Sequence, residues 1–480
     1  MIELHDHQSE LVEQVRGAYR EGYRAPLVCL STGGGKTVIF SYIANKATGC
    51  VLIIAHRSEL IKQISLSLGR FDTLHNVIAP ENVIRQCKVD HFKEFGRSFV
   101  DHRSKVFVAS VQTLVRRFNT IRAVPDLIII DEAHHLTGGT QWAKVADQYP
   151  KARRLLVTAT PIRLDGKGLD EYADKMILGK PMRWLIDNGY LSDYRLVVPP
   201  NELDLSGIRT KMGDYEKDKL ESAVDKPSIT GDAVKHYLSM AKGKRAIVFC
   251  VSIKHGKHVA EQFNAAGIPS EMLETDNRES AIQRFRTGEI QVLTSCEIVS
   301  EGFDLPAIEV AILLRPTKSM ALYLQQVGRA LRVMGGKDCA IILDHVGNSG
   351  RVSSGSFIPK HGMPDDDREW SLKGRERKRR RDDDEPDAKI RTCPACYCVH
   401  KSELTECPQC GHVYVAGLKR EIKQVEGNLV EIKRAATIQR KKEERDCKTL
   451  EDFIELGRQR GYQYPEQWAK HRIKFRQKKS

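Results

Sequence analysis

The 480-residue sequence predicts an α/β fold with two tandem parallel-sheet domains, followed by a small zinc ribbon and a helical, basic C-terminal region. Three observations lead to this prediction. Near-continuous apolar segments alternate with amphipathic segments in two successive blocks, which is typical of parallel sheets covered on both faces. A glycine-rich string occurs once, after the first strand of the first block. Two cysteine pairs follow the second block.

The first block, residues 1–195, contains five apolar segments of strand length. A chain of 480 residues is too long for one ordinary core, so these segments are expected to build a domain of their own. The predicted strands are Leu27–Leu30, Val51–Ala55, Val106–Ser110, Leu127–Ile130 and Leu155–Thr158.

The string STGGGKT, Ser31–Thr37, lies between the first strand and a helix-compatible stretch, Val38–Asn45. Strand, glycine-rich loop and helix form the layout of a phosphate-binding loop, in which glycine lets the backbone N–H groups approach a phosphate. The lysine would reach the β- and γ-phosphates, and the threonine hydroxyl would hold Mg²⁺. Leu30 replaces the first glycine of the strict motif, and a glycine turn without phosphate is the alternative. The predicted nucleotide-binding residues are Thr32, Gly33, Gly34, Gly35, Lys36 and Thr37.

An acidic pair ends another strand of the first block. Leu127–Ile130 runs directly into Asp131 and Glu132. The carboxyl end of a central parallel strand faces the crevice where ligands bind. Asp131 would therefore hold Mg²⁺, and Glu132 would orient or deprotonate the attacking water. The alternative is a solvated acidic strand end.

The second block, residues 196–360, repeats the strand pattern without a phosphate loop. Residues 196–226 are polar and are expected to connect the two domains. The predicted strands are Ala246–Val251, Val292–Ser295, Val310–Leu314 and Ala340–Leu343.

The second block also carries the string QQVGRALR, Gln325–Arg332. Arg329 and Arg332 lie three residues apart, on one face if the segment is helical. Such guanidinium groups can stabilise the charge that develops on the γ-phosphate. Gln325 would position the water or couple the domains. Two solvated arginines on a surface helix are the alternative.

These strings together resemble a superfamily 2 DEAD/DEAH-box helicase or translocase. The acidic motif reads Asp131-Glu132-Ala133-His134, and further strings resemble the remaining family motifs in the family's order over residues 1–350. They are AHRSEL (55–60), ASVQTL (109–114), VTATP (157–161), IVFC (247–250) and SEGFDLP (300–306). The resemblance implies two RecA-like domains that share one ATP in the cleft between them.

The resemblance also implies roles for single residues. Gln8 would read adenine, although His5 and His7 replace the arginine and aromatic residue often found beside it. Thr158 and Thr160 would couple the ATP site to the nucleic acid, and Gly302 and Asp304 would lie between both sites. The residues implied to grip the nucleic-acid strand are Arg57, Gln112, Thr113 and Thr294.

Finer features resemble RadD-type bacterial DNA-repair ATPases and their phage-encoded relatives. They are LRPT (314–317) leading into YLQQ (323–326), LDHVGN (343–348), and cysteine pairs placed after the motor. This resemblance implies DNA rather than RNA, a role in replication, repair or recombination, and a cytoplasmic setting in a bacterial or phage-infected cell. It also implies a single-strand-binding protein or another replication or repair protein as partner.

The C-terminal region divides by composition. Residues 361–390 contain the run RERKRRRDDDEPD and are predicted to be a charged linker. Residues 391–413 hold two C-x-x-C pairs, whose four thiolates predict a structural Zn²⁺ site, with Cys398 and His400 as spare ligands. The alternatives are a redox dithiol or unused cysteines. The four predicted zinc ligands are Cys393, Cys396, Cys407 and Cys410.

Charge favours an anionic partner. The net charge is +14, and residues 371–480 hold 28 lysines and arginines against 18 aspartates and glutamates. Residues 414–480 are predicted to form a basic helical tail that either tracks a nucleic-acid backbone or folds as a cap around Trp468. There is neither an apolar run of about 18 residues nor an apolar signal core, which predicts no membrane contact and no secretion.

The sequence thus predicts an enzyme that uses ATP, Mg²⁺ and Zn²⁺ and couples ATP hydrolysis to movement on, or remodelling of, DNA. Three alternatives remain open. The core motifs also suit an RNA helicase, because they grip a backbone without reading the 2′-hydroxyl. A translocase subunit of a restriction system would need a partner chain for cleavage. A zinc-containing nucleic-acid-binding module could use ATP only as a switch, without unwinding.

Overall fold

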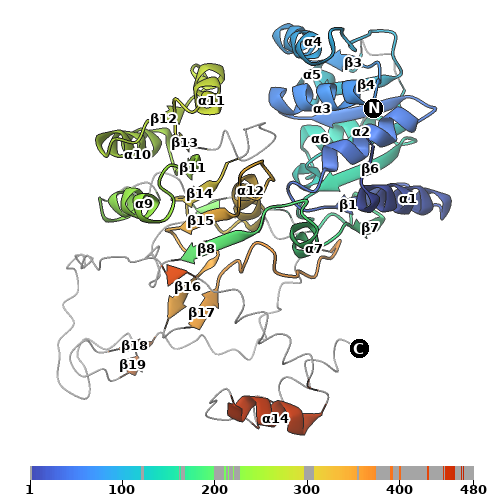
Figure 1. The fold of residues 1–480 in the computed structure, drawn as a ribbon. Helices are drawn as coiled ribbons and strands as arrows, with labels where there is room; N and C mark the ends of the chain where they lie inside the picture. Colours follow the sequence, from blue (N-terminus) through green and yellow to red (C-terminus); the bar gives the residue numbers. More distant parts are fainter. Residues whose placement is uncertain are drawn as a thin grey trace.

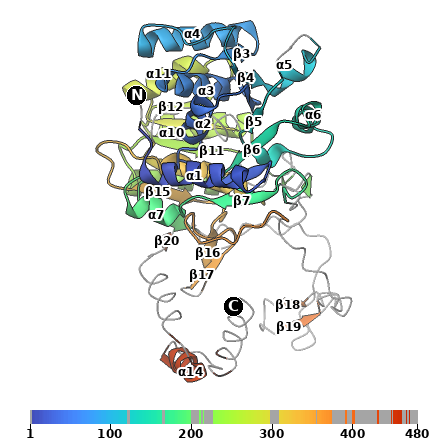
Figure 2. The ribbon, with the colours of Figure 1, turned by 90° about the vertical axis from the view of Figure 1, so that its right-hand side faces the viewer.

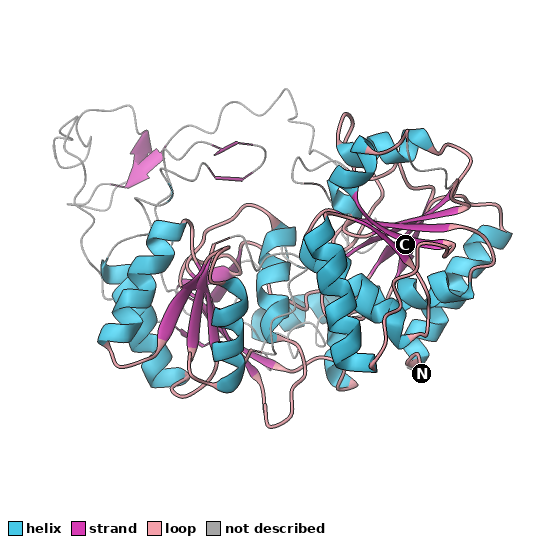
Figure 3. Cartoon of the chain, turned by 90° about the horizontal axis from the view of Figure 1, so that it is seen from above, coloured by secondary structure: helices cyan, strands magenta, loops and turns pink. Residues whose placement is uncertain are grey.

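The computed structural model describes residues 3–119, 124–161, 163, 168–198, 210–211, 214–215, 220, 227–296, 308–353, 356–373, 390–392, 399–401, 430–431, 447, 449–459, 466 and 469. The main part of the chain forms two α/β domains that lie side by side, each a twisted sheet with helices on both faces (Figure 1, Figure 3). The predicted fold class is confirmed for these two domains.

The first domain is built on a parallel sheet of seven strands in the order β3-β4-β2-β5-β6-β1-β7. All five predicted strands are present, and the short strands β3 and β7 extend the sheet at its edges. The strands are β1 Pro26–Cys29, β2 Val51–Ala55, β3 Asn76–Ile78, β4 Val106–Ser110, β5 Leu127–Ile130, β6 Arg153–Thr158 and β7 Lys175–Leu178.

Helices cover both faces of this sheet because its strands are apolar on both sides. Four helices pack on one face, and Figure 2 shows them in front of the sheet. They are α1 Asp6–Arg20, α2 Lys36–Lys46, α3 Ser58–Arg70 and α4 Glu81–Phe95. The other face is covered by α5 Val111–Arg116, the 3₁₀ turn η1 Ala133–His135 and α6 Gln141–Gln148.

The second domain has a seven-stranded sheet in the order β12-β13-β11-β14-β15-β8-β20. Its strands are parallel except β20, which pairs antiparallel with β8. The predicted boundary between residues 195 and 196 falls inside β8, a strand of this second sheet. The strands are β8 Tyr194–Val198, β11 Ala246–Phe249, β12 Ser270–Leu273, β13 Val292–Ser295, β14 Val310–Leu313, β15 Ala340–Asp344 and β20 Val430–Glu431.

Helices also cover both faces of the second sheet. One face carries α7 Met182–Asp187, α11 Arg278–Thr287 and α12 Met320–Ala330, and the other carries α9 Pro227–Met240 and α10 Ile253–Ala265. The chain therefore enters the second core at α7, before β8. The remaining elements are β9 Thr210–Lys211, β10 Asp214–Tyr215, β16 Gly350–Ser353, β17 Ser356–Pro359, β18 Ile390–Thr392, β19 Val399–Lys401 and α14 Leu450–Gln459.

Residues 361–373, the first part of the predicted charged linker, pack against both domains. Met363 is buried in the second core, and the Tyr323 hydroxyl donates to the carbonyl oxygen of Gly362 at 3.1 Å. At the other end, the carbonyl oxygen of Leu372 accepts the backbone N–H of Leu169 at 2.7 Å. Leu372 also packs on the core of the first domain. The segment therefore crosses from the second domain back to the first and is anchored by Met363 and Leu372. The many charged residues around these two side chains led to the prediction of a linker.

Of the predicted zinc ribbon, the structure describes only residues 391–392 and 399–401, in the antiparallel pair β18–β19, and its cysteine ligands lie outside the described residues. This holds for the ligands Cys393, Cys396, Cys407 and Cys410, and for the spare ligand Cys398. Within the described ranges, no group of three or more His, Cys, Asp or Glu side chains is arranged to hold a metal ion. No helix found there has the length and apolar character needed to span a membrane.

Candidate functional site

The phosphate loop connects β1 to α2, as the sequence predicts. Gly33 and Gly35 adopt left-handed φ values of 86° and 88°, which favour glycine because a Cβ would be strained there. Gly35 directly precedes α2, so the helix N-terminus with its partial positive charge faces the loop. The Lys36 ammonium donates to the carbonyl oxygen of Leu30 at 3.2 Å and lies folded over the loop.

Gln8 lies against this loop from α1. Its side chain is 5% exposed, and its Oε1 accepts the backbone N–H of His5 at 3.1 Å. A Cβ placed at Gly35 would overlap Nε2 of Gln8, so the glycine permits the amide to approach. The structure therefore places the predicted adenine reader beside the phosphate loop.

An aromatic cluster extends from Gln8 along the domain boundary. The Tyr190 ring lies 4.4 Å from the His7 ring and 4.9 Å from the His5 ring, measured between centroids. Trp184 of α7 stacks on Tyr190 at 5.8 Å with an interplanar angle of 17°. Burial lowers the pKa of His7, as does the neighbouring His5, so a neutral ring is favoured. The sequence has histidines where a larger aromatic residue is often found beside Gln8. Trp184 of α7 and Tyr190 of the turn after it supply an aromatic surface at this place.

The acidic pair lies at the carboxyl end of β5. The residues Asp131 and Glu132 are 4% and 9% exposed, and the Glu132 backbone N–H donates to Asp131 Oδ1 at 3.0 Å. Burial, and then the adjacent Glu132 carboxylate, raises the pKa of Asp131 to about 7, whereas Lys36 acts in the opposite direction. A buried carboxylate beside another carboxylate and a lysine is suited to receive a cation and a phosphate.

The threonines of the VTATP string are joined to this acidic turn. His134 Nδ1 lies 3.4 Å from Glu132 Oε2 and 3.3 Å from Thr158 Oγ1. Thr158 in turn donates its hydroxyl to the Thr160 carbonyl oxygen at 3.0 Å and accepts the Thr160 backbone N–H at 3.2 Å. Both threonines are buried. The structure thus brings the proposed coupling residues into contact with the acidic motif.

The second domain reaches the phosphate loop through α12. Gly328 packs so closely that a Cβ there would lie 2.8 Å from Cβ of Thr32. Gln325 and Arg329, on the same helix, are each 5% exposed. The sequence predicted no contact for Gly328, because its approach to Thr32 depends on how the two domains dock.

Arg332 lies beyond the helix that carries Arg329. The helix ends at Ala330 with Leu331 as its C-cap, so the predicted shared helical face is not formed. The reason is a polar cap: Lys337 Nζ donates to the carbonyl oxygen of Arg332 at 2.9 Å and also to that of Ala330. The Ser192 hydroxyl bonds the same Arg332 oxygen at 3.2 Å.

The close approach of Gly328 to Thr32 yields a first prediction. Gly328→Ala should lower kcat for ATP hydrolysis about tenfold or more, because an added methyl group separates α12 from the phosphate loop. Gly335→Ala is the matched control, since nothing lies within 4 Å of a Cβ there. Steady-state ATPase rates of the two variants are compared, and equal rates would contradict a role for the Gly328–Thr32 contact in ATP hydrolysis.

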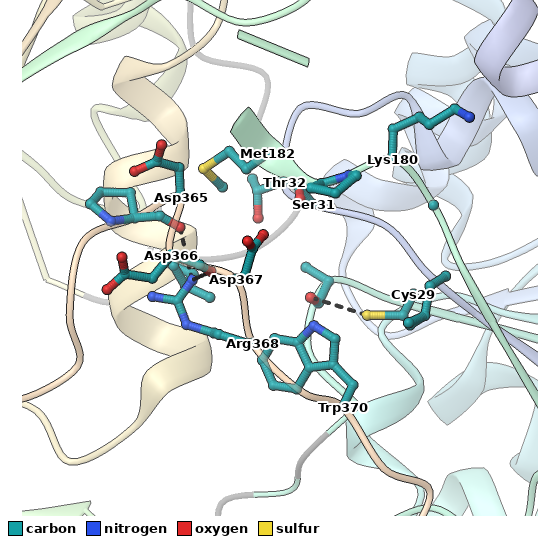
Figure 4. Close-up of a pocket in the computed structure, with 16 residues that line it drawn as sticks. Cys29, Ser31, Thr32, Lys180, Met182, Asp365, Asp366, Asp367, Arg368 and Trp370 are labelled. Atoms are coloured by element: carbon teal, nitrogen blue, oxygen red, sulfur yellow. Dashed lines mark hydrogen bonds between the residues drawn. The ribbon is translucent and has the colours of Figure 1, made fainter. Parts of the chain in front are cut away.

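A cavity of about 140 Å³ lies beside the loop, between the domains (Figure 4). Ser31 and Thr32 line one side, and residues 364–368 with Trp370 line the other. Arg368 holds this second wall in place by donating to backbone carbonyl oxygens, including that of Met363 at 2.7 Å. The segment 361–373 therefore lines a cavity between the two domains beside the phosphate loop, which its charged sequence did not indicate.

Most of the residues proposed to grip a nucleic-acid strand lie at the carboxyl ends of neighbouring β-strands in the first sheet. Arg57 follows β2, and Gln112 and Thr113 follow β4, its neighbour in the sheet. All three are half-buried. Thr294, by contrast, is fully buried in β13 and donates its hydroxyl to the Gly256 carbonyl oxygen at 2.8 Å, so a strand cannot reach it in this arrangement. Gly302 and Asp304 lie outside the described residues.

The second domain closes on the same edge. Arg278 at the start of α11 forms an ion pair with Glu59 of α3, across the domain boundary. Burial lowers the pKa of Arg278, and the nearby positive charge of Arg57 lowers it further. Two arginines from different domains therefore lie near each other where the nucleic-acid strand is expected, and one of them is paired with Glu59.

Two family patterns match the chain. The family described as "Type III restriction enzyme, res subunit" matches residues 1–163, and "Helicase conserved C-terminal domain" matches residues 230–334. Each match covers one of the two sheets in large part.

Curated relatives span much of the chain. A 51.5 kDa protein of a Lactococcus phage is 33% identical over 83% of this chain and 80% of its own length. A Saccharomyces cerevisiae protein with the name "Putative ATP-dependent helicase IRC3" is 31% identical over 76% of this chain, which spans 55% of that protein. The DNA 3′-5′ translocase XPB2 of Sulfurisphaera tokodaii is 23% identical over 69% of this chain and 79% of its own length.

A solved structure shares the fold. The HsdR fragment of a type I restriction enzyme from Vibrio vulnificus superimposes with a TM-score of 0.54 at 20% identity. The match covers 72% of this chain and 64% of that one.

Proposed function

Because this chain belongs to the superfamily 2 DEAD/DEAH-type helicases and hydrolyses ATP, we propose that it couples hydrolysis to movement along, or remodelling of, DNA. One observation carries the proposal. The phosphate loop of the first domain is covered by α12 of the second, with Gly328 against Thr32. A nucleotide held there contacts both domains, so its hydrolysis changes the free energy of their closure.

The residues divide the chemistry between them. The backbone N–H groups of residues 33–35 and the Lys36 ammonium bind the phosphates. Glu132 orients the attacking water and accepts its proton, held near His134 at 3.4 Å. Arg329 compensates the charge that develops on the transferred phosphoryl group.

Asp131 and Thr37 are the residues that would hold Mg²⁺. The buried carboxylate, with its raised pKa, and the hydroxyl in the first turn of α2 fit a small oxygen-seeking cation. The ion would neutralise charge on the β- and γ-phosphate oxygens.

The raised pKa of Asp131 predicts a pH dependence. At limiting Mg²⁺, ATP hydrolysis should increase as the pH rises through about 7, because only the ionised carboxylate is a ligand. Higher Mg²⁺ should move the midpoint to lower pH. The effect on stability has the opposite sign: between the ordinary value of 3.8 and about 7 the folded state retains a proton that the unfolded state loses, so this group's contribution to the free energy of unfolding falls as pH rises.

Initial rates at limiting and saturating Mg²⁺ across this pH range would test the dependence. A midpoint that does not move with Mg²⁺ concentration would contradict the assignment of Asp131 as a metal ligand.

Some features support a nucleic-acid partner in general, and the name of one relative favours DNA over RNA. Arg57, Gln112 and Thr113 line one sheet edge near the domain boundary, and the net charge is +14. One relative is named a DNA translocase.

Trp184 and Tyr190 offer an aromatic surface beside Gln8 for the adenine base of ATP.

The finer assignments stay predictions. They are the RadD-type subfamily, a role in replication, repair or recombination, a single-strand-binding partner and the cytoplasmic setting. We also propose that the four cysteines Cys393, Cys396, Cys407 and Cys410 hold one structural Zn²⁺, because four thiolates complete a tetrahedral site. Metal analysis of the purified chain, with Cys407→Ser as the control, tests this directly.

A second candidate function is a translocase subunit of a restriction system. The match of residues 1–163 to the restriction-enzyme family favours it, as does the shared fold with an HsdR fragment. The sequence contains no recognisable nuclease constellation, so cleavage would require a partner chain. DNA cleavage by the purified chain alone would therefore contradict this reasoning.

The experiment that tests the proposed function is an ATPase assay without nucleic acid and with single-stranded, duplex or forked DNA, or RNA. Lys36→Ala provides the blank. Stimulation by DNA but not RNA, abolished by the substitution, is expected. Stimulation by RNA alone would overturn the DNA assignment. Hydrolysis without any response to nucleic acid would favour a partner-activated subunit, and DNA-stimulated hydrolysis without strand displacement would favour translocation or an ATP-controlled binding module.

A further inference from the structure

A chain of side chains connects the strand-gripping edge to the acidic motif, beginning at His56. This residue follows β2 and directly precedes Arg57. Nε of Arg57 donates a hydrogen bond to Nε2 of His56 at 3.1 Å. The acceptor role of Nε2 requires the ring proton to be on Nδ1, because a nitrogen that accepts carries no hydrogen. The imidazole of His56 thus holds one side of the Arg57 guanidinium.

The His56 ring also contacts the turn that follows the acidic pair. Its centroid lies 4.9 Å from that of His135, with the two rings edge to face at 67°. His135 stacks on Trp142 of α6 at 6.2 Å and 9°, which fixes the orientation of its ring. Trp142 is buried, at 6% exposure. The sheet explains this meeting: β2 and β5 are neighbours, so the residues that follow them leave the sheet at the same edge.

The turn itself links His135 to the hydrolytic carboxylate. The rings of His134 and His135 lie 4.3 Å apart, and His134 Nδ1 is 3.4 Å from Glu132 Oε2. The Glu132 backbone has φ 51° and ψ 50°, a left-handed conformation that costs free energy in any residue with a Cβ. A turn held in such a conformation by its neighbours can shift when one of those neighbours moves.

We propose that His56 and His135 are positioning residues that couple a nucleic-acid strand bound at Arg57 to the orientation of Glu132. The proposal rests on the proposed function. When a phosphate of the strand competes for the Arg57 guanidinium, the hydrogen bond to His56 changes. The His56 ring then moves against His135, and the turn Ala133–His135 carries Glu132 with it. In this proposal both histidines act through Arg57 and Glu132 rather than by binding ATP or the nucleic-acid strand themselves.

The test compares His56→Phe and His135→Phe with wild type, with and without saturating single-stranded DNA. Phenylalanine keeps the ring packing and removes the ring nitrogens. We expect the DNA-stimulated kcat to fall about 5- to 20-fold, while the basal kcat and the Kd for DNA stay within about twofold of wild type. His56→Gln should restore part of the stimulation, because its Oε1 can accept from Arg57 Nε. His258→Phe, a histidine of α10 that bonds Gln262 at 3.1 Å, is the matched control.

A double-mutant cycle measures the coupling itself. The double variant should lose no more stimulation than either single variant, since both substitutions interrupt one path. Additive losses, or equal losses of basal and stimulated activity, would overturn the proposal. A wild-type ATPase that ignores every nucleic acid would instead reject the proposed function, and the coupling with it. Stimulated wild type with equally stimulated variants would reject the coupling alone.

Discussion

Arg329→Ala is expected to lower kcat for ATP hydrolysis by about 10³-fold or more, with a small effect on the affinity for ATP. In the proposed function the first domain would bind the phosphates, mainly through Lys36 and the loop glycines. Arg329 belongs to the second domain, on α12 next to Gly328, and is 5% exposed. Its guanidinium would act where negative charge develops during phosphoryl transfer, so its loss should affect the transition state more than the bound nucleotide.

Two further variants sharpen the Arg329 experiment. Arg329→Lys retains a charge without the planar fork and should recover part of the activity. Arg284→Ala is the control, because this arginine of α11 is paired with Glu271 near the surface, at 2.5 Å, away from the loop. Thermal unfolding should accompany the kinetics, since truncation of a buried arginine can destabilise the domain. A kcat within tenfold of wild type in a folded Arg329→Ala variant would reject its role as an arginine finger.

Glu132→Gln should lower kcat by about 10²- to 10⁴-fold, the usual contribution of a general base. Glutamine has the same shape and keeps a hydrogen-bond acceptor near His134, but it cannot accept the proton of the attacking water. ATP should therefore still bind, and the closed, ATP-bound state should accumulate. The variant should then bind DNA with the affinity of that state. Single-turnover hydrolysis and nucleotide-binding titrations separate these effects.

The control for this substitution is Glu94→Gln. Glu94 of α4 lies in the same domain and pairs with Arg70 at 2.6 Å, far from the acidic turn. It should retain wild-type kinetics. If Glu132→Gln weakened ATP binding as much as it lowered kcat, Glu132 would be a ground-state ligand rather than the base.

Local patterns sufficed to predict both sheets and their central strands. The five strands predicted in the first domain and the four in the second are continuous apolar runs, and all are present with small changes at their ends. The strands that escaped prediction are short or polar, such as β3 Asn76–Ile78 and β12 Ser270–Leu273. These two lie at sheet edges, where one neighbour is missing and a continuous apolar run is not required. The inner strand β8 was also missed, because residues 196–226 were expected to form a polar connection between the domains.

Other predictions failed where a tertiary contact overrides a local pattern. Arg332 was expected on the helix of Arg329, but the Lys337 ammonium bonds the last carbonyl groups and the helix ends first. Thr294 was expected to contact the strand, but β13 is covered on both faces and buries it. Residues 361–373 were expected to be a charged linker, yet Met363 and Leu372 anchor them to two different cores.

By itself, the sequence determined the class of fold, the phosphate loop and the acidic pair, because strand periodicity and a loop–helix motif are properties of neighbouring residues. Only the tertiary structure decided which distant surfaces meet. The packing of Gly328 on Thr32 depends on how two domains dock, and the contact of His56 with His135 depends on β2 and β5 being neighbours in the sheet. Such contacts join residues far apart in the chain, so no spacing in the sequence encodes them.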